Sequence, residues 1–324
     1  MIVVRAPLRL EFLGGSTDIA SFYRRSPGHI LNSTIDKYIY VVVKPAPGRG
    51  IMFLHEKTER VSHRDQLEHA RAKAVLRHFG VTDGLEIVSL SDVPYGGSGL
   101  GSSSSFVVAL IHAIAILFRE RATPRAIAEL AAHIEIEALK EPIGKQDQYA
   151  SAFGGLNHTI YRRNGFVDVK RVRLTARNQR ALQEHILVFH TGAGHSASAI
   201  LGAQAKRDKE NFPYLKQMAA LAEPAAAALM RGDVERFAGY LTEEWMIKRN
   251  LSAGIATPEL LRMHAAAIRA GAWGGRVSGA GGGGFLYVLA PRSRHTAVRK
   301  ALARYGEFPV RFTEKGSEVV ADLR

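Results

Sequence analysis

The sequence predicts a two-domain protein of α+β or α/β class. The chain has 324 residues, which is long enough for two domains that share a cleft. Strand-like and helix-like segments alternate in both halves. A strand, a glycine-rich turn and a helix follow one another over 85–117. We therefore expect domains at 1–180 and 181–324, with the polar stretch 175–183 as the boundary.

Short β-rich runs and turns fill the first part of the chain, with strands predicted at 2–4, 9–13, 30–31 and 38–43. Beyond them, apolar residues three or four positions apart predict helices. In order we expect a helix at 69–79, a strand at 85–90, a helix at 102–117, a helix from Thr123 to the break at Pro142, and strands at 157–161 and 166–172. Thr123 and Pro124 form a good helix start, an N-cap residue followed by proline.

Helices dominate the second half. A strand of buried character is predicted at 186–189. Helices follow at about 197–209, 214–231, 233–247 and 258–270. A strand at 285–289 comes directly after a glycine run, and a helix and a strand close the chain.

The composition indicates a globular protein without disulfides. Apolar residues make up 46% of the chain with no long apolar run, and there is no cysteine. The absence of cysteine fits a reducing compartment. Met1 leads directly into a strand-like segment, so we expect no secretion signal. These features predict a cytoplasmic protein that does not bind a membrane.

The net charge of +14 is open to several interpretations. It suits nucleic acid, an anionic membrane surface or anionic small molecules. There is no long basic run and no RNA-binding motif, and the densest basic cluster lies at 170–180. Phosphorylated substrates explain the excess at least as well as nucleic acid, and a solvated basic surface is the plain alternative.

The glycine-rich stretch from Pro94 to Phe106 is the main functional signal. Its glycines permit positive φ angles and close approach of a ligand. Ser102–Ser105 occupy the first helical turn, where unpaired amides and the helix dipole favour an anion. A flexible linker is a poor alternative, because a well-patterned strand and helix flank the stretch.

Two better-known phosphate loops do not fit this stretch. No lysine follows Gly101, as a Walker loop requires, and Ser102 stands where a dinucleotide fingerprint has its third glycine. We predict a distinct nucleotide-phosphate loop. Its residues are Pro94, Gly96, Gly97, Ser98, Gly99, Leu100, Gly101, Ser102, Ser103 and Ser104.

Arg9 and the turn that follows it form a second candidate segment. Arg9 lies in an otherwise apolar strand, so an inward-pointing guanidinium would need an anion beside it. After Gly14 and Gly15, Thr17 and Asp18 offer a hydroxyl and a carboxylate to the hydroxyls of a polyol. A hairpin turn with an incidental arginine explains this segment about as well.

Two acidic residues in the middle of the chain suit phosphoryl transfer, which needs a metal ion and a carboxylate near the attacking hydroxyl. Mg²⁺ keeps several waters, so one carboxylate and one serine hydroxyl would suffice to hold it. Asp147 lies in a polar cluster after Gly144. The alternative interpretation of Glu135 is an ordinary surface residue of a charged helix. Further on, the glycine run 279–284 before a strong strand indicates close backbone approach.

Three of these segments together resemble the motifs of the GHMP small-molecule kinases. Residues 5–9 with the Gly-Gly-Ser-Thr-Asp turn are similar to the first motif, 94–104 to the second and 277–284 to the third. Arg276 stands where the third motif usually has lysine. Residues 33–38, 144–150 and 244–249 most resemble the D-glycero-D-manno-heptose 7-phosphate kinases, which are themselves similar to L-fucokinases and other sugar 1-kinases.

The resemblance implies a role for each matching residue. Asp147 would be the catalytic carboxylate and Arg9 its basic partner. Glu135 and Ser103 would hold Mg²⁺. The expected substrate-binding residues are Gly14, Gly15, Thr17, Asp18, Lys145, Gly279, Gly281 and Gly282.

The resemblance also implies an α+β fold with an amino-terminal domain like the second domain of ribosomal protein S5 and a ferredoxin-like carboxy-terminal domain. The implied activity is ATP-dependent phosphorylation of the anomeric hydroxyl of the heptose 7-phosphate, for nucleotide-activated heptose and surface polysaccharide. A kinase of a free sugar such as fucose or galactose, or a non-catalytic ATP and sugar sensor, is the alternative. We expect small-molecule substrates and no nucleic acid, and a homo-oligomer is left open.

A substrate that already carries a phosphate needs a second anion site. The basic candidates for it are Arg24, Arg25, Lys37, Lys145, Lys248 and Arg249. Lys145 is the first choice, because it lies two residues from Asp147.

Overall fold

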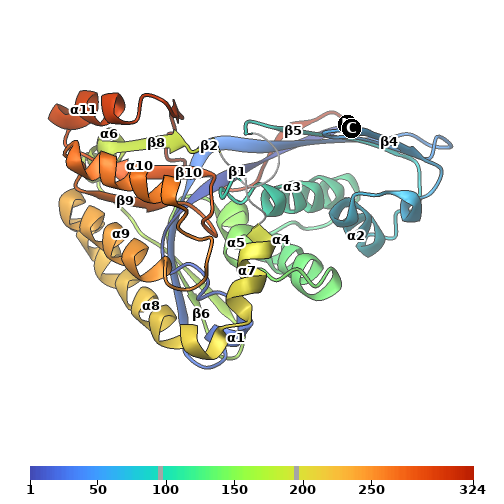
Figure 1. Cartoon of the computed structure of the whole chain (residues 1–324). Coiled ribbons are helices and arrows are strands. Elements are labelled where there is room, and N and C mark those ends of the chain that lie inside the picture. The colour runs from blue at the N-terminus through green and yellow to red at the C-terminus, as the bar shows by residue number, and fades with distance from the viewer. Residues whose placement is uncertain (94–97, 193–196) are drawn as a thin grey trace.

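Two β-sheets lie next to one another and carry the helices of the chain (Figure 1). The computed structural model describes residues 1–93, 98–192 and 197–324. Within these ranges the larger sheet has eight strands, in the order β12-β1-β2-β5-β3-β4, with β6 and β7 continuing from β2. The smaller sheet has four, in the order β11-β8-β10-β9.

Most of the larger sheet is built from the first half of the chain. Its strands are β1 (Ile2–Leu13), β2 (Gly28–Pro45), β3 (Ile51–Leu54), β4 (Thr58–Val61), β5 (Leu85–Ser91), β6 (Leu156–Tyr161), β7 (Val167–Arg171) and β12 (Glu318–Asp322). The smaller sheet consists of β8 (Ile186–His190), β9 (Gly274–Val277), β10 (Phe285–Leu289) and β11 (Gly306–Glu307). Every described strand pair except β3 with β5 is antiparallel, which decides between the two predicted classes in favour of α+β.

Helices α2 to α5 lie beneath one face of the larger sheet in Figure 1. They are α2 (Ala70–His78), α3 (Ser102–Leu117), α4 (Pro124–Ala132), a π-helical turn (His133–Ala138) and α5 (Gln146–Phe153); the short α1 (Ala20–Tyr23) follows β1. Residues 106–111 of α3 are apolar and buried all round, as expected of a helix enclosed by a sheet and other helices. The enclosed position fixes α3, and therefore Gly101 at its start.

The remaining helices accompany the smaller sheet. They are α6 (Ala176–His185), α7 (Ala197–Ala205), α8 (Asp208–Arg231), α9 (Val234–Lys248), α10 (Pro258–Arg269) and α11 (His295–Ala301). A second hydrophobic core gathers here around Trp245, Phe189 and Leu286, all at most 1% exposed. None of the helices in the described parts of the chain is both long and apolar enough to span a bilayer.

The structure joins elements that the sequence separates. The predicted strands 2–4 and 9–13 form the single strand β1, whose register shifts between Pro7 and Arg9. Such a bulge accommodates proline, which lacks an amide donor. The predicted runs 30–31 and 38–43 likewise belong to one strand, β2, which pairs with β6 at one end and β5 at the other.

The polar stretch 175–183, which is the expected domain boundary, forms most of helix α6 and its N-cap. Thr175 caps α6, since its hydroxyl accepts the Asn178 amide at 3.2 Å. Leu182 is the one residue of α6 that is fully buried, which explains why hydrophobic periodicity gives so little signal there.

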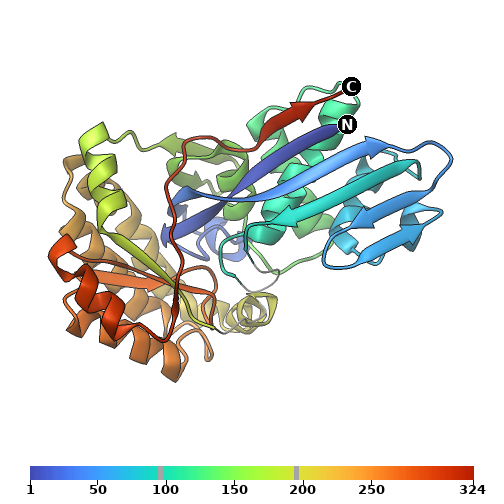
Figure 2. The same ribbon diagram turned by 90° about the horizontal axis from the view of Figure 1, so that it is seen from above.

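β12 belongs to the larger sheet, although the expected division of the chain assigns its residues to the second domain. It pairs antiparallel with β1, with Ile2 opposite Asp322. On the way, Phe312 bridges to Ile35 of β2. Figure 2 shows the two ends of the chain side by side at the edge of the larger sheet.

Candidate active site

The start of α3 lies between the two glycine runs. Gly99 and Gly101 have φ angles of 69° and 82°, the left-handed region that favours glycine. Gly101 is the N-cap of α3, without a side-chain cap and without an acidic residue in the first turn. Ser102 is half-buried and Ser103 exposed. The amides of this turn are therefore available to an anion, and the site fits a nucleotide phosphate. Of the expected loop, Pro94, Gly96 and Gly97 lie outside the described residues.

The two glycine-rich runs meet at Gly99 and Gly279. A Cβ on Gly279 would lie 2.7 Å from Cα of Gly99, which only glycine avoids. The Ser278 hydroxyl donates to the Gly99 carbonyl at 2.9 Å. Gly281 and Gly282 contact Ile255: the Gly282 amide donates to its carbonyl at 2.8 Å, and a Cβ on Gly281 would lie 2.7 Å from its side chain. Among the described residues of the phosphate loop, Gly99 is therefore in contact with the first part of the late glycine run.

Arg9 and Asp147 form an ion pair beside this loop. Arg9 Nε donates to Asp147 Oδ1 at 2.7 Å, and Arg9 Nη1 donates to the Gly99 carbonyl. The Arg9 side chain is only 4% exposed, whereas that of Asp147 is 24% exposed. A Cβ on Gly101 would lie 3.2 Å from the Asp147 carboxyl. The structure thus brings the predicted catalytic pair together at the start of α3.

Burial raises the pKa of Asp147 above its usual value, and the neighbouring Arg9 opposes that rise. A carboxylate with a raised pKa is a better proton acceptor than an ordinary one. The group can therefore hold, orient or accept the proton of a hydroxyl placed between it and the phosphate loop.

In the turn after β1, both Thr17 and Asp18 are buried, and each makes hydrogen bonds to the backbone. The Thr17 hydroxyl is fully buried, donating to the His29 carbonyl at 3.1 Å and accepting the His29 amide at 3.0 Å. It therefore fastens the turn to β2. Asp18 Oδ2 accepts the Gln146 amide at 2.8 Å, and a Cβ on Gly144 would overlap this carboxylate. Burial chiefly raises the pKa of Asp18, to about 7, with Asp147 and Glu11 adding to the effect.

Lys145 directly precedes Gln146 and Asp147 in the chain and contacts Gly165 and Tyr23. Its ammonium donates to the Gly165 carbonyl at 3.4 Å and stands 5.3 Å from the centre of the Tyr23 ring. The side chain is half-buried. Tyr161 and Gln146 add polar groups nearby: the Tyr161 hydroxyl and Gln146 Oε1 are buried and have no hydrogen-bond partner among the described residues.

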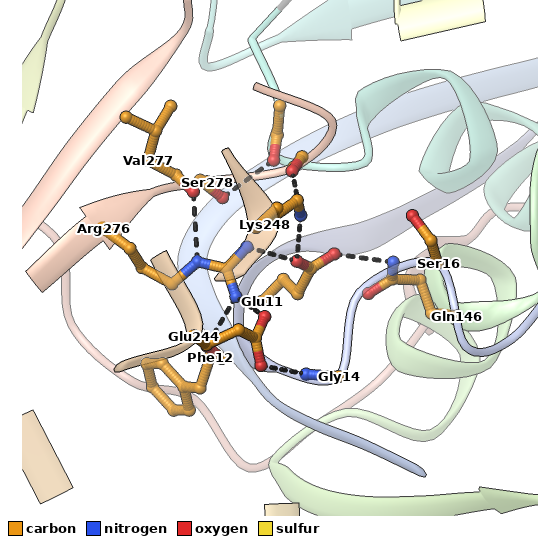
Figure 3. Close-up of polar contacts among 12 residues, drawn as sticks. Glu11, Phe12, Gly14, Ser16, Gln146, Glu244, Lys248, Arg276, Val277 and Ser278 are labelled. Carbon is orange, nitrogen blue, oxygen red and sulfur yellow. Dashed lines mark hydrogen bonds and ion pairs between the residues drawn. The ribbon is translucent and has the colours of Figure 1, made fainter. Parts of the chain in front are cut away.

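A cluster of four buried charges links β1 of the larger sheet to α9 and β9, which form the lobe around the smaller sheet (Figure 3). We call Glu11, Glu244, Lys248 and Arg276 the interlobe charge cluster; each is at most 2% exposed. Glu11 Oε1 accepts from Lys248 Nζ at 2.9 Å and from Arg276 Nη2 at 2.7 Å. Arg276 Nη1 also pairs with Glu244. Although burial opposes ionisation, Lys248 and Arg276 hold the pKa of Glu11 well below its usual range.

The interlobe charge cluster holds three parts of the site. Glu244 accepts the Gly14 amide at 2.5 Å, and Lys248 donates to the Gly279 carbonyl at 2.7 Å. Gln146 Nε2, next to Asp147, donates to Glu11 Oε2 at 2.7 Å. A Cβ on Gly15 would lie 2.8 Å from Lys248 Nζ, so Gly14 and Gly15 pack on this cluster.

Glu135 is fully buried in the π-helical turn, an irregularity common at functional sites. Its Oε1 accepts from Arg71 Nε at 2.8 Å and its Oε2 from Gln148 Nε2 at 2.6 Å. Gln148 also donates to the Ser104 hydroxyl at 3.2 Å. Ser104 therefore belongs to this network, whereas Ser103 is exposed.

The donor set around Glu135 fits Mg²⁺ in part. It contains one carboxylate, the Ser104 hydroxyl and the side-chain oxygen Oε1 of Gln148, which is buried without a partner among the described residues. Oxygen donors of this kind suit Mg²⁺, which keeps several waters. The described residues hold no group of three or more acidic or histidine side chains that could bind a metal. Arg71 would have to release Glu135 for a metal to take its place.

Several residues of the site are not apparent from the sequence. Glu11 could have been predicted from the sequence. It is a charged residue in the same apolar strand as Arg9, and residues two positions apart in a strand point to the same face. Arg71, Gln146 and Gln148 carry none, since polar residues on helices are ordinarily solvated.

The family models agree with this architecture. The GHMP kinases N terminal domain matches residues 68–155, and the GHMP kinases C terminal domain matches residues 225–307. The chain belongs to the GHMP kinase family and is an ATP-dependent sugar kinase. The predicted family and its two-domain α+β fold are confirmed.

Its similarities extend over the whole chain. It is 30% identical over 319 residues to a D-glycero-alpha-D-manno-heptose 7-phosphate kinase of Campylobacter jejuni, covering 94% of this chain and 93% of the relative. A Bacteroides thetaiotaomicron structure described as a D-glycero-D-manno-heptose 1-phosphate kinase is 25% identical, with a TM-score of 0.83 and full coverage of both chains. Lactococcus lactis galactokinase with bound galactose shares the fold, at 17% identity, a TM-score of 0.77, and coverage of 98% of this chain and 94% of the galactokinase.

Proposed function

We propose that the enzyme transfers the γ-phosphoryl group of ATP to the anomeric hydroxyl of D-glycero-D-manno-heptose 7-phosphate, giving the 1,7-bisphosphate and ADP. The observation that carries this proposal is the Arg9–Asp147 ion pair, which touches the phosphate loop through Gly99. The name of the C. jejuni relative supports the choice of sugar.

Asp147 and Arg9 would act on the acceptor hydroxyl. The sugar oxygen forms a bond to the γ-phosphorus while the bond to the bridging β,γ-oxygen breaks, and the hydroxyl proton passes to Asp147. Since loose phosphoryl-transfer transition states need little base assistance, orientation of the hydroxyl is the larger part of this role. Arg9 fixes the carboxylate and adds positive charge next to the transferred group.

The donor side would use the first turn of α3 and Glu135. The amides at Ser102, Ser103 and Ser104 would bind phosphate oxygens. Glu135, with a serine of this turn, would hold Mg²⁺, which neutralises phosphate charge when bound. Arg71 then keeps its second acidic partner, Glu141, at 3.0 Å.

The polar groups around Asp18 would bind the sugar. Asp18 can accept from a sugar hydroxyl, and the unpartnered Gln146 Oε1 and Tyr161 hydroxyl provide an acceptor and a donor. Burial, reinforced by Asp18, raises the pKa of Tyr161 well above its usual value, so this hydroxyl keeps its proton. Buried polar groups of this kind select a substrate by the hydroxyls that satisfy them.

A substrate screen tests the proposal. Release of ADP would be measured with heptose 7-phosphate, heptose 1-phosphate, the free heptose, fucose and galactose. We expect the highest kcat/KM with heptose 7-phosphate. Equal or better use of a free sugar would replace the proposal with a free-sugar kinase, and preference for heptose 1-phosphate would move the reacting hydroxyl. ATP and sugar binding without turnover would mark a sensor.

Lys145 is our candidate for the distal phosphate of the substrate. Lys248 is unsuitable, because its ammonium already binds Glu11 and Gly279. Arg25 pairs with Asp208 at 3.0 Å. Among the described residues, the Lys145 ammonium has no ion-pair partner; it makes a long hydrogen bond to the carbonyl of Gly165 at 3.4 Å and lies over the Tyr23 ring.

Lys145→Met should therefore raise the KM for heptose 7-phosphate by about tenfold or more, since charge-assisted contacts to phosphate are strong. The KM for ATP should hold within about twofold. Lys37→Met, at a cation 3.8 Å from Asp36, is the control. An unchanged sugar KM in Lys145→Met would exclude Lys145 from the phosphate site.

A further inference from the structure

A cavity of about 270 Å³ opens where β6, β7 and α6 meet the segment before β12. Its apolar wall includes Leu156, Leu182 and Phe312, and its polar rim includes Arg171, Arg173 and Gln179. The volume suits a molecule of one ring with a small head group rather than a nucleotide.

The cavity lies on the other face of the larger sheet from the catalytic pair. Ser33 lines it, and Ser33 is paired across the strands with Leu10. Leu10 follows Arg9, and successive residues of a strand point to opposite faces. Figure 2 shows the segment before β12 crossing the face of the sheet seen from above, and α2 to α5 lie below the sheet in Figure 1. A ligand here would not overlap the sugar and ATP site.

The rim of the cavity carries excess positive charge. Arg171 and Arg173 belong to the stretch 170–180, which has five basic residues and no acidic one. Arg173 is exposed and has no ion-pair partner among the described residues. Glu314 is the acidic group of the lining, and it approaches Arg171 only to 3.5 Å. The rim therefore favours an anion, and Arg173 is free to bind it.

Contacts with the backbone hold the Arg171 guanidinium in place. Its Nη2 donates to the carbonyls of Phe153 at 3.3 Å and Glu314 at 3.4 Å. Gly155, at a φ of 75°, leaves the space that the guanidinium occupies, since a Cβ there would overlap Nη1. Only a residue without a side chain permits this placement.

We propose that this cavity is a second small-molecule site, for an organic anion whose apolar body fills the cavity and whose phosphate or carboxylate head binds Arg173 and Arg171. The site also has contact with the catalytic elements. Arg171 holds the carboxyl end of α5, which carries Asp147 at its other end. Phe312 packs edge-on against Phe12 of β1 at 5.9 Å.

Calorimetric titration tests the proposal on the whole enzyme, with the active site saturated by a non-hydrolysable ATP analogue together with heptose 7-phosphate. The probes are phenyl phosphate, benzoate and inorganic phosphate. We expect phenyl phosphate or benzoate to bind more tightly than inorganic phosphate, because only they fill the apolar wall. The tighter of the two identifies the head group. Inorganic phosphate binding as tightly as both would mean a surface anion site and would overturn the proposal, as would no binding of any probe.

Two exposed arginines of the same stretch provide a matched pair of variants. Arg173→Glu should weaken the better probe by about tenfold or more, because it replaces a charge-assisted contact with repulsion. Arg177→Glu makes the same change of charge outside the cavity lining and should leave the affinity within about twofold. Equal losses in the two variants would show only a general charge effect and would contradict the proposed site.

Discussion

At the scale of single residues, Asp147 is the group on which turnover should depend most. Asp147→Asn keeps the shape of the side chain and a hydrogen bond from Arg9, but removes the negative charge. We expect kcat to fall by roughly 10²-fold or more, because positioned proton-transfer help is lost. ATP affinity, measured by titration, should be nearly intact. Near-normal kcat would exclude the proposed role.

Asp18 makes the enzyme less stable at higher pH. Its pKa is about 7 in the folded protein, whereas an unperturbed aspartate has a pKa of 3.8, so the folded state binds the extra proton between these values. A group whose folded pKa is raised destabilises the fold progressively as pH rises from about 4 to 7. Asp18→Asn, which can still accept the Gln146 amide, should therefore raise the free energy of unfolding at pH 8 by more than at pH 5.

Urea unfolding at the two pH values measures this difference, which the part of the pKa shift lying between pH 5 and pH 7 limits to about 3 kcal/mol. Asp83→Asn, at an exposed loop residue, is the control and should change stability equally at both pH values. The same stability change for Asp18→Asn at pH 5 and pH 8 would contradict the raised pKa.

At the scale of the elements, the loop before α3 should tolerate no side chain at Gly101. Gly101→Val forces a β-branched residue into a φ of 82° and places its Cβ against Asp147. ATP affinity should be lost while the fold is retained. Gly80→Val introduces the same strain at a φ of 67°, with nothing near its Cβ, and should keep its ATP affinity. Calorimetric titration of both variants decides whether the loop binds the phosphates.

The sequence predicts these elements well where local signals suffice. Gly99, Gly101 and Ser102 indicate the loop, because backbone conformation and helix starts are local properties. α6 is not predicted, because this helix buries a single residue and therefore shows no periodic pattern of apolar residues. The π-helical turn around Glu135 is not predicted either. Its hydrogen bonds span one residue more than those of an α-helix, and the pattern of apolar residues in the sequence does not reveal this.

At the scale of the whole molecule, the interlobe charge cluster could not be predicted. Glu11 and Lys248 are 237 positions apart and meet only because β1 and α9 dock. From the sequence, Lys248 is instead a candidate phosphate ligand. Arg9 and Asp147, 138 positions apart, can be paired from the sequence only through resemblance to a family.

Lys248→Met should destabilise the enzyme by about 3–5 kcal/mol, because it removes one partner of a buried ion pair and leaves Glu11 undercompensated. Arg249→Met, at the next and exposed position, should change stability by no more than about 0.5 kcal/mol. Urea unfolding measures both. Equal stability of the two variants would mean that water or a rearranged Arg276 replaces the lost ammonium.

The pairing of β1 with β12 has a consequence for how the protein is made. β1 leaves the ribosome long before β12, so its outer edge stays uncovered through most of synthesis. An uncovered edge offers a row of unpaired amides and carbonyls to any other nascent strand. The interval between translation of these two strands is therefore when the chain is most exposed to misassembly, and when a chaperone would protect it most.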